Sequence, residues 1–186
     1  MDNGAGSYRR FREEGDENGL IEIIRDYKDG LILYLNSIVG NIRTAEELAE
    51  DTFVLLGIKK PKDKGKGSFK TWLYTIGRNR AVDYLRKTSK RKEMPIEDYR
   101  SLAADTESLE SAYIREERKI TLHRAMECLK PEYRQILWLI YFEDFSHKQA
   151  AAIMGKSVHN TETLVYRARR SLKTLLEAEG FVYEEL

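Results

Sequence analysis

The spacing of apolar residues constrains this chain more than any other feature. Between residues 20 and 38 they recur every three or four positions, which is the period of one buried face of an α-helix. The same period returns in later segments, and only three prolines interrupt the sequence. Alternating apolar and polar runs bounded by turn residues, which mark half-buried strands, are hard to find. The sequence therefore predicts an all-α fold.

Three helices are expected in the first half of the chain. The helix over residues 20–38 should end at Gly40, because glycine readily takes the left-handed backbone angles that follow a helix. Thr44 and Glu47 have the spacing of a capping box, which predicts that a second helix begins there and ends before Gly57. Ser68 can cap a third helix.

The helical pattern is lost between the two halves of the chain. Residues 88–108 lack periodicity, change charge sign and contain Pro95, which is typical of a tether. We therefore expect two small helical domains, one over residues 1–90 and one over 109–186, joined by a flexible linker over 91–108.

Residues 146–173 predict a helix-turn-helix. Ser146 and Gln149 form a capping box for a short helix, and Gly155 supplies the left-handed residue of a tight turn. Ser157 can then cap a longer helix. One face of that longer helix is apolar, and the opposite face carries donors, acceptors and cations suited to base edges and phosphates. A solvated last helix of a bundle would show the same local pattern, so this stretch alone leaves both readings open.

Charge is segregated along the chain although its net value is only +1. Residues 59–92 hold thirteen lysines and arginines against two acids, and residues 93–117 hold eight acids against two arginines. Such blocks favour a basic surface facing a polyanion, with solvated helix faces as the alternative.

Several classes of function find no support in the sequence. The single cysteine cannot form an internal disulfide, and the three histidines lack partners at metal-ligand spacing, so no metal or other cofactor is expected. Neither a phosphate-binding glycine motif nor a carboxylate cluster for two metals is present, so no catalytic residue is assigned. The longest apolar run, residues 136–142, is too short to span a bilayer, and the polar start is unlike a signal peptide. A cytoplasmic protein without membrane insertion is expected.

Three stretches resemble the extracytoplasmic-function (ECF) sigma factors of the sigma-70 family. The run from Tyr133 through RQILWLIYFEDFSHKQAAAIMGKS to VYRARRSL is similar to their promoter-binding region. AEELAEDTF, residues 45–53, and GSFKTWLYTIGRNRAVDYLRK, residues 67–87, resemble their polymerase-binding and promoter-opening helices. Together the matches cover most of residues 20–175 in the family's order.

The resemblance implies a non-enzymatic factor that binds core RNA polymerase, reads promoter DNA and is held inactive by an anti-sigma factor. Polymerase binding would fall to the acidic face of the second helix, Glu46, Glu47, Glu50, Asp51 and Val54. The minus-ten element would be bound and opened by Lys59, Lys60, Lys64, Arg78, Asn79, Arg80 and Arg86. The minus-35 element would be read by His159, Asn160, Glu162, Thr163, Tyr166, Arg167 and Arg170.

Two residues of the last helix depart from the family pattern. Glu162 stands where many members carry lysine, arginine or serine, and Thr161 stands where many carry an apolar residue. A carboxylate can accept a hydrogen bond from a cytosine amino group, so we hypothesise that Glu162 selects a C·G pair. Of the nearby aromatics, Trp72 lies on an apolar stripe and is expected in the core, whereas the role of Tyr74 stays open.

Other functions compete with this interpretation. A stand-alone helix-turn-helix regulator would explain residues 146–173 but leaves the acidic helix of the first domain and its basic segment, residues 59–67, without a function. An enzyme acting on nucleic acid and a pure protein-interaction module are further alternatives.

Overall fold

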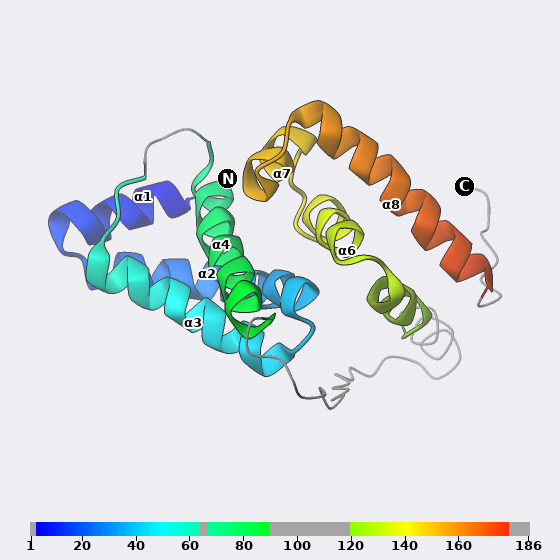
Figure 1. Cartoon of the computed structure of the whole chain (residues 1–186). Helices are drawn as coiled ribbons and strands as arrows, with labels where there is room; N and C mark the ends of the chain where they lie inside the picture. Colours follow the sequence, from blue (N-terminus) through cyan, green and yellow to red (C-terminus); the bar gives the residue numbers. More distant parts are fainter. Residues whose placement is uncertain (1–2, 64–66, 90–119, 179–186) are drawn as a thin grey trace, which may run out of the picture.

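The computed structural model describes residues 3–63, 67–89 and 120–178, and every regular element within them is helical (Figure 1). The all-α prediction is confirmed. In chain order the elements are α1 (Gly4–Arg9), the π-helical turn η1 (Arg10–Glu14), α2 (Glu17–Val39), α3 (Ile42–Lys59), α4 (Phe69–Ser89), a helical stretch over 120–128, α6 (Pro131–Leu137), the π-helical turn η2 (Trp138–Phe142), α7 (His147–Met154) and α8 (Val158–Ala178).

The first domain is built on the long helix α2, which packs against α1, α3 and α4. Its apolar stripe is buried as the spacing predicts, and Gly40 ends the helix with φ +69°. The central side chains, all fully or almost fully buried, are Ile23, Leu31, Tyr34, Leu35, Leu56, Phe69, Leu73 and Tyr74.

Helix α3 is longer than predicted, with its N-cap three residues earlier and its last residue three residues later. Asn41, with extended backbone angles, is the N-cap, and its Oδ1 accepts a hydrogen bond from the Thr44 backbone N–H at 3.0 Å. The helix continues through Gly57 to Lys59 and ends where Lys60 takes φ +42°. Asn41 directly follows the turn at Gly40, and its side chain bonds a free N–H group of the first turn. The helix therefore begins before Thr44.

Helix α4 is continuous over its 21 residues and is buried on two sides. Ser68 caps it as predicted, since its Oγ accepts from the Thr71 backbone N–H at 3.2 Å. Helices α2 and α3 of the first domain and α7 of the second domain all pack against α4. Contact with several partners explains why its apolar residues do not fall on a single stripe.

The second domain packs α8 against α6 and α7. Pro131 opens α6 at its first turn, where the missing N–H has no intrahelical partner to lose. Ile136, Leu139, Ile153 and Ala168 lie at its centre with no more than 1% of their surface exposed.

The two domains contact each other through α2 with α6 and through α4 with α7. Glu143, just after η2, is the polar centre of the second contact: its Oε2 lies 3.0 Å from Lys70 Nζ and accepts a hydrogen bond from Tyr74 Oη at 2.6 Å. The rings of Tyr74 and Phe145 meet edge to face at 5.1 Å. Burial, and secondarily the Glu143 carboxylate, raises the pKa of Tyr74. The predicted linker over 91–108 lies outside the described residues.

Candidate nucleic-acid interface

Helices α7 and α8 form the predicted helix-turn-helix. The Ser146 Oγ accepts from the Gln149 backbone N–H at 3.3 Å while the Ser146 N–H donates to Gln149 Oε1 at 2.9 Å, which completes the capping box. Gly155 takes φ +64° and ends α7. Ser157 then accepts from the Asn160 N–H at 3.2 Å. Short polar side chains thus fix the starts of both helices.

The buried face of α8 holds a polar residue that is satisfied internally. Thr161 is fully buried, but its Oγ1 donates to the Ser157 carbonyl oxygen at 2.9 Å. A hydroxyl bonded to its own helix can replace an apolar side chain without leaving an orphan donor. The Thr161 departure therefore does not disturb the packing of α8, whose other buried residues are Leu164, Val165, Ala168 and Leu176.

The opposite face of α8 presents the residues predicted to contact a minus-35 element. Tyr166 is 67% exposed, Thr163 is half-buried, and the rest of the set is exposed: His159, Asn160, Glu162, Arg167 and Arg170. Four of the seven share one surface hollow, whose lining residues are Glu132, Lys156, His159, Asn160, Thr163, Leu164 and Arg167. The geometry therefore brings this set together on one solvent-facing surface.

Two acidic side chains border that surface. Glu132 Oε1 pairs with Lys156 Nζ at 3.2 Å, at the rim of the hollow. Glu162 Oε1 lies 4.0 Å from Nδ1 of His147 at the start of α7, and the Glu162 side chain remains 53% exposed. The Glu162 carboxylate is therefore accessible as a hydrogen-bond acceptor on the surface of the helix-turn-helix.

The residues predicted for the minus-ten element lie on two parts of the first domain. Lys59 and Lys60 are exposed at the end of α3, and Asn79 and Arg86 are exposed on α4. Arg78 and Arg80 are half-buried, and Lys64 lies outside the described residues.

These residues form an extended set and do not gather at one point. Arg80 contacts Asp51, which precedes Lys59 by eight positions. Eight residues of α-helix correspond to about 12 Å along the axis. A surface of that length matches several nucleotides of an extended strand better than one small ligand.

The acidic residues of α3 form the predicted exposed face. Glu46, Glu47, Glu50 and Asp51 are exposed, and Val54, 54% exposed, stands among them. The Asp51 Oδ2 lies 3.3 Å from Arg80 Nη1 of α4, so this face adjoins a residue of the minus-ten set. That proximity was not predicted from the sequence.

The two aromatics weighed for base stacking are both engaged inside the protein. Trp72 packs in the core, where its ring lies 5.3 Å from that of Tyr8 and 5.6 Å from that of Phe69. Tyr74 is 1% exposed at the contact between the domains. Tyr74 therefore offers no free ring face for stacking, whereas Trp72 is only partly buried.

The N-terminal unit formed by α1 and η1 was not predicted from the sequence. Tyr8 is 3% exposed, and its hydroxyl donates to the Pro61 carbonyl oxygen at 2.7 Å. Burial raises the pKa of Tyr8 from 10.0 to about 12. Lys60 Nζ lies 4.5 Å from the centre of the Phe11 ring. The three-residue spacing of Tyr8 and Phe11 was the available signal for this unit.

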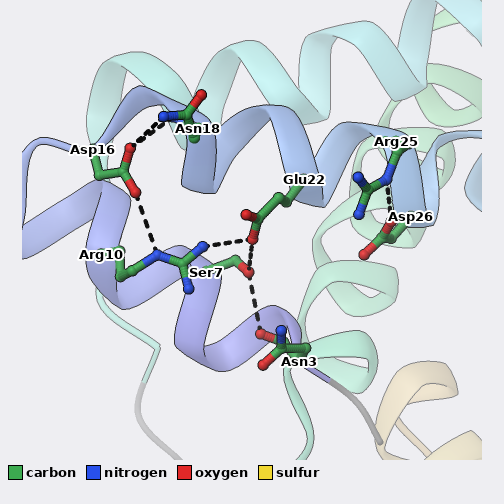
Figure 2. A network of polar contacts seen from close by, with 8 residues as sticks. All are labelled: Asn3, Ser7, Arg10, Asp16, Asn18, Glu22, Arg25 and Asp26. Carbon is green, nitrogen blue, oxygen red and sulfur yellow. Dashed lines mark hydrogen bonds and ion pairs between the residues drawn. The ribbon is translucent and has the colours of Figure 1, made fainter.

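A polar network fastens this unit to α2 (Figure 2). Glu22 Oε2 accepts from Ser7 Oγ and from Arg10 Nη2, each at 2.6 Å. Arg10 Nε also donates to Asp16 Oδ2 at 3.3 Å, and Asp16 caps α2 by accepting from the Asn18 N–H. The Ser7 and Arg10 bonds lower the pKa of Glu22.

Two features are absent from the described residues. Among them, no three His, Cys, Asp or Glu side chains come together in a way that could hold a metal ion. None of the helices in that part of the chain is both long and apolar enough to cross a bilayer.

Comparison with known proteins identifies two conserved family regions in this chain. Residues 23–91 match the profile described as Sigma-70 region 2, and residues 119–172 match that of Sigma-70, region 4. The first match covers most of the domain with the acidic helix, and the second covers most of α8 and all of α6 and α7.

Individual relatives agree with these matches. The ECF RNA polymerase sigma factor SigM of Bacillus subtilis is 32% identical over 155 residues, 83% of this chain and 93% of SigM. The B. subtilis RNA polymerase sigma factor YlaC is 29% identical over 153 residues, 82% of this chain and 88% of YlaC. The sigma factor RpoE of Bartonella quintana, solved in complex with the anti-sigma factor NepR, superposes with a TM-score of 0.69 at 26% identity, covering 84% of this chain and 95% of RpoE.

These matches account for both domains. A stand-alone helix-turn-helix regulator is not favoured, because such a protein would leave the region 2 match unexplained. Sigma factors are transcription initiation factors and not enzymes. The chain belongs to the ECF sigma factors of the sigma-70 family, which direct RNA polymerase to promoters.

Proposed function

We propose that three surfaces of this sigma factor divide the work of promoter-specific initiation. The acidic face of α3 binds core RNA polymerase, the end of α3 together with α4 binds and opens the minus-ten element, and the exposed face of α8 reads the minus-35 element in duplex form. The observation that carries the proposal is that one chain presents two exposed faces, an acidic one on α3 of the first domain and a polar one on α8 of the second.

The α3 face has the composition expected of a specific protein contact. Its four acids share an exposed face with Val54, so charge can orient a basic partner while the apolar side chain is desolvated. The complementary surface on polymerase would be basic with an apolar pocket.

Opening of the minus-ten element requires no bond chemistry in this proposal. Cations and polar groups along about 12 Å of the first domain hold the backbone and an unpaired base of the displaced strand. The chain therefore acts by binding one strand conformation better than the duplex, without a catalytic residue or cofactor.

The α8 face combines base-reading and phosphate-binding groups. Glu162 and Thr163 point to base edges, with Glu162 accepting from a cytosine amino group, while Arg167 and Arg170 suit phosphates. His159, Asn160 and Tyr166 complete the contact surface.

An anti-sigma factor is a further proposed partner, and the cytoplasm is the proposed location. The similar RpoE binds the anti-sigma factor NepR. A protein that contacts both domains of this chain at once would cover surfaces that polymerase and promoter DNA need.

The first test is binding to bacterial core RNA polymerase, followed by gel filtration. The wild-type chain should co-elute with core enzyme at one to one, and Glu50→Lys should weaken the complex at least tenfold. Asp51→Lys would be less clean, because a lysine there would also repel Arg80. Asp29→Lys, an equal charge change on an exposed residue of α2, is the control. Unchanged binding by Glu50→Lys would contradict the assignment of this face.

The second test is a selection from DNA with a randomised minus-35 region, using the reconstituted holoenzyme. Glu162→Ala should lose preference at one base pair, equivalent to about 1–3 kcal/mol of discrimination. Glu177→Ala, near the far end of the same helix, should leave the selected sequence unchanged. If Glu162→Ala selected the same sequence as wild type, the C·G hypothesis would be wrong.

A further inference from the structure

We infer that Tyr8 is a positioning residue for the basic segment after α3, and that this N-terminal contact sets where Lys60 and Lys62 meet DNA. The inference rests on the proposed function, which gives that segment a role at the minus-ten element. Tyr8 and Phe11 precede residue 23, where the match to Sigma-70 region 2 begins. The unit therefore lies outside the region 2 match.

Tyr8 contacts both ends of the connection between α3 and α4. Its hydroxyl donates to the carbonyl oxygen of Pro61, just after α3, at 2.7 Å. Its ring lies 5.5 Å from that of Phe69 and 5.3 Å from that of Trp72, in the first turn of α4. The Tyr8 side chain thus contacts the residues on both sides of the basic segment.

The backbone at this point favours such an external contact. Lys60 has φ +42°, a left-handed angle that a lysine adopts at an energetic cost and that needs support from its surroundings. Pro61 has a fixed φ and no N–H, so its carbonyl is the backbone group it can offer to a partner. Tyr8 takes that carbonyl and thereby fixes the direction in which the chain leaves α3.

A second contact orients a lysine of the segment. Lys60 Nζ lies 4.5 Å from the Phe11 ring centre, within the range of a cation–π interaction. Lys60 as a whole is exposed, so its ammonium group can still meet a phosphate.

The unit that carries Tyr8 is itself held firmly on α2. A Cβ at Gly19 would collide with the Ser7 carbonyl oxygen, so the two backbones touch there. The Glu22 bonds to Ser7 and Arg10 secure the same contact (Figure 2). Because α1 and η1 are held on α2, the Tyr8 side chain has a fixed position and can hold the basic segment in place.

The test compares Tyr8→Phe with Ser7→Ala. Each change removes one hydroxyl from adjacent residues of α1, but the Tyr8 hydroxyl bonds the basic segment and the Ser7 hydroxyl bonds α2. The first readout is cleavage between Lys62 and Asp63 by a lysine-specific protease in the free full-length chain, followed by mass spectrometry. The second is promoter opening by holoenzyme on a selected promoter, followed by the reactivity of unpaired thymines, with core binding measured in parallel.

Tyr8→Phe should speed that cleavage and slow promoter opening roughly two- to tenfold, the range for one lost hydrogen bond, with core binding unchanged. Ser7→Ala should leave both rates near wild type, because the Arg10 bond to Glu22 and the backbone contact at Gly19 still hold the unit on α2. Wild-type rates in Tyr8→Phe, or equal effects of the two changes, would overturn the inference. If wild-type holoenzyme opened no selected promoter, the proposed function would fail, and the cleavage rates would still decide whether Tyr8 positions the segment.

Discussion

At the scale of single residues, one close contact decides which side chain fits at several positions. Gly19 lies where α1 and α2 touch, and Gly77 lies where α4 approaches Leu31, with a Cβ there reaching 2.9 Å from the leucine side chain. Neither glycine stands out in the sequence, because a missing side chain leaves no periodic signal. The buried tyrosines are similar: their spacing predicts burial, but not the group that each hydroxyl meets.

Gly19→Ala should destabilise the fold. The new methyl group would meet the Ser7 carbonyl oxygen in a packed contact, at a cost of roughly 1–3 kcal/mol. Gly6→Ala is the control: its Cβ would lie 3.5 Å from Asn3 Oδ1, so greater helix propensity should make it neutral or stabilising by up to about 1 kcal/mol. Urea unfolding midpoints measure both, and equal midpoints would contradict the close approach.

Stability should fall as the pH rises above 10. Burial raises the pKa of Tyr8 to about 12 and raises those of Tyr34 and Tyr74 as well. Above pH 10 the unfolded chain loses phenolic protons that the folded chain keeps, so the stabilisation present below pH 10 is lost as pH rises toward the folded-state values. Unfolding measured between pH 8 and 12 should show this slope, and Tyr8→Phe should reduce it. A flat profile would rule out this burial effect.

At the scale of elements, local sequence rules predicted most helix boundaries. The starts of α4, α7 and α8 follow from Ser68, Ser146 and Ser157, because each cap bonds an N–H within three residues. The predicted start of α3 was wrong, because Asn41, directly after the Gly40 turn, caps the helix by accepting from the Thr44 N–H. The N-terminal helix was missed because its apolar stripe consists of only Tyr8 and Phe11, and the glycine contacts and polar network that also hold it give no periodic signal.

Asn41→Ala should therefore destabilise α3, whereas Thr44→Ala should not do so to the same extent. Loss of the Asn41 cap should cost about 0.5–2 kcal/mol of unfolding free energy. Thr44, already within the helix, should change stability by no more than about 0.5 kcal/mol. Thermal unfolding of the two variants measures both effects. A larger loss of stability in Thr44→Ala than in Asn41→Ala would contradict the cap seen in the structure.

At the scale of the whole molecule, the two domains share one contiguous apolar cluster and a polar contact at Glu143. The sequence predicted both domains and the composition of the α8 face, because each depends on spacing within one helix. It could not predict the partners of Glu143, since Lys70 and Tyr74 lie about seventy positions earlier. For the same reason, the contact between the acidic face and the minus-ten set was not foreseen.

Glu143→Gln should loosen the domain contact. The Glu143 side chain is only 10% exposed, and losing its charge-assisted bonds to Lys70 and Tyr74 should cost roughly 1.5–3 kcal/mol. The neighbouring Asp144→Asn is the control, because Asp144 is exposed and asparagine tolerates its φ of +55°. Small-angle X-ray scattering should show a larger radius of gyration for Glu143→Gln alone, and identical radii would argue against this contact in solution.

The ion pair between Asp51 and Arg80 gives the proposed function a thermodynamic linkage. Each residue is assigned to a different macromolecule, so polymerase bound at Asp51 would release Arg80 for DNA. Linkage requires the effect to be reciprocal, and promoter DNA bound at Arg80 would then strengthen the hold on polymerase by the same factor. Because the Asp51 side chain is 65% exposed, the factor is small, at most roughly fivefold. A modest factor of this kind favours assembly at a promoter while still permitting the sigma factor to leave once transcription is under way.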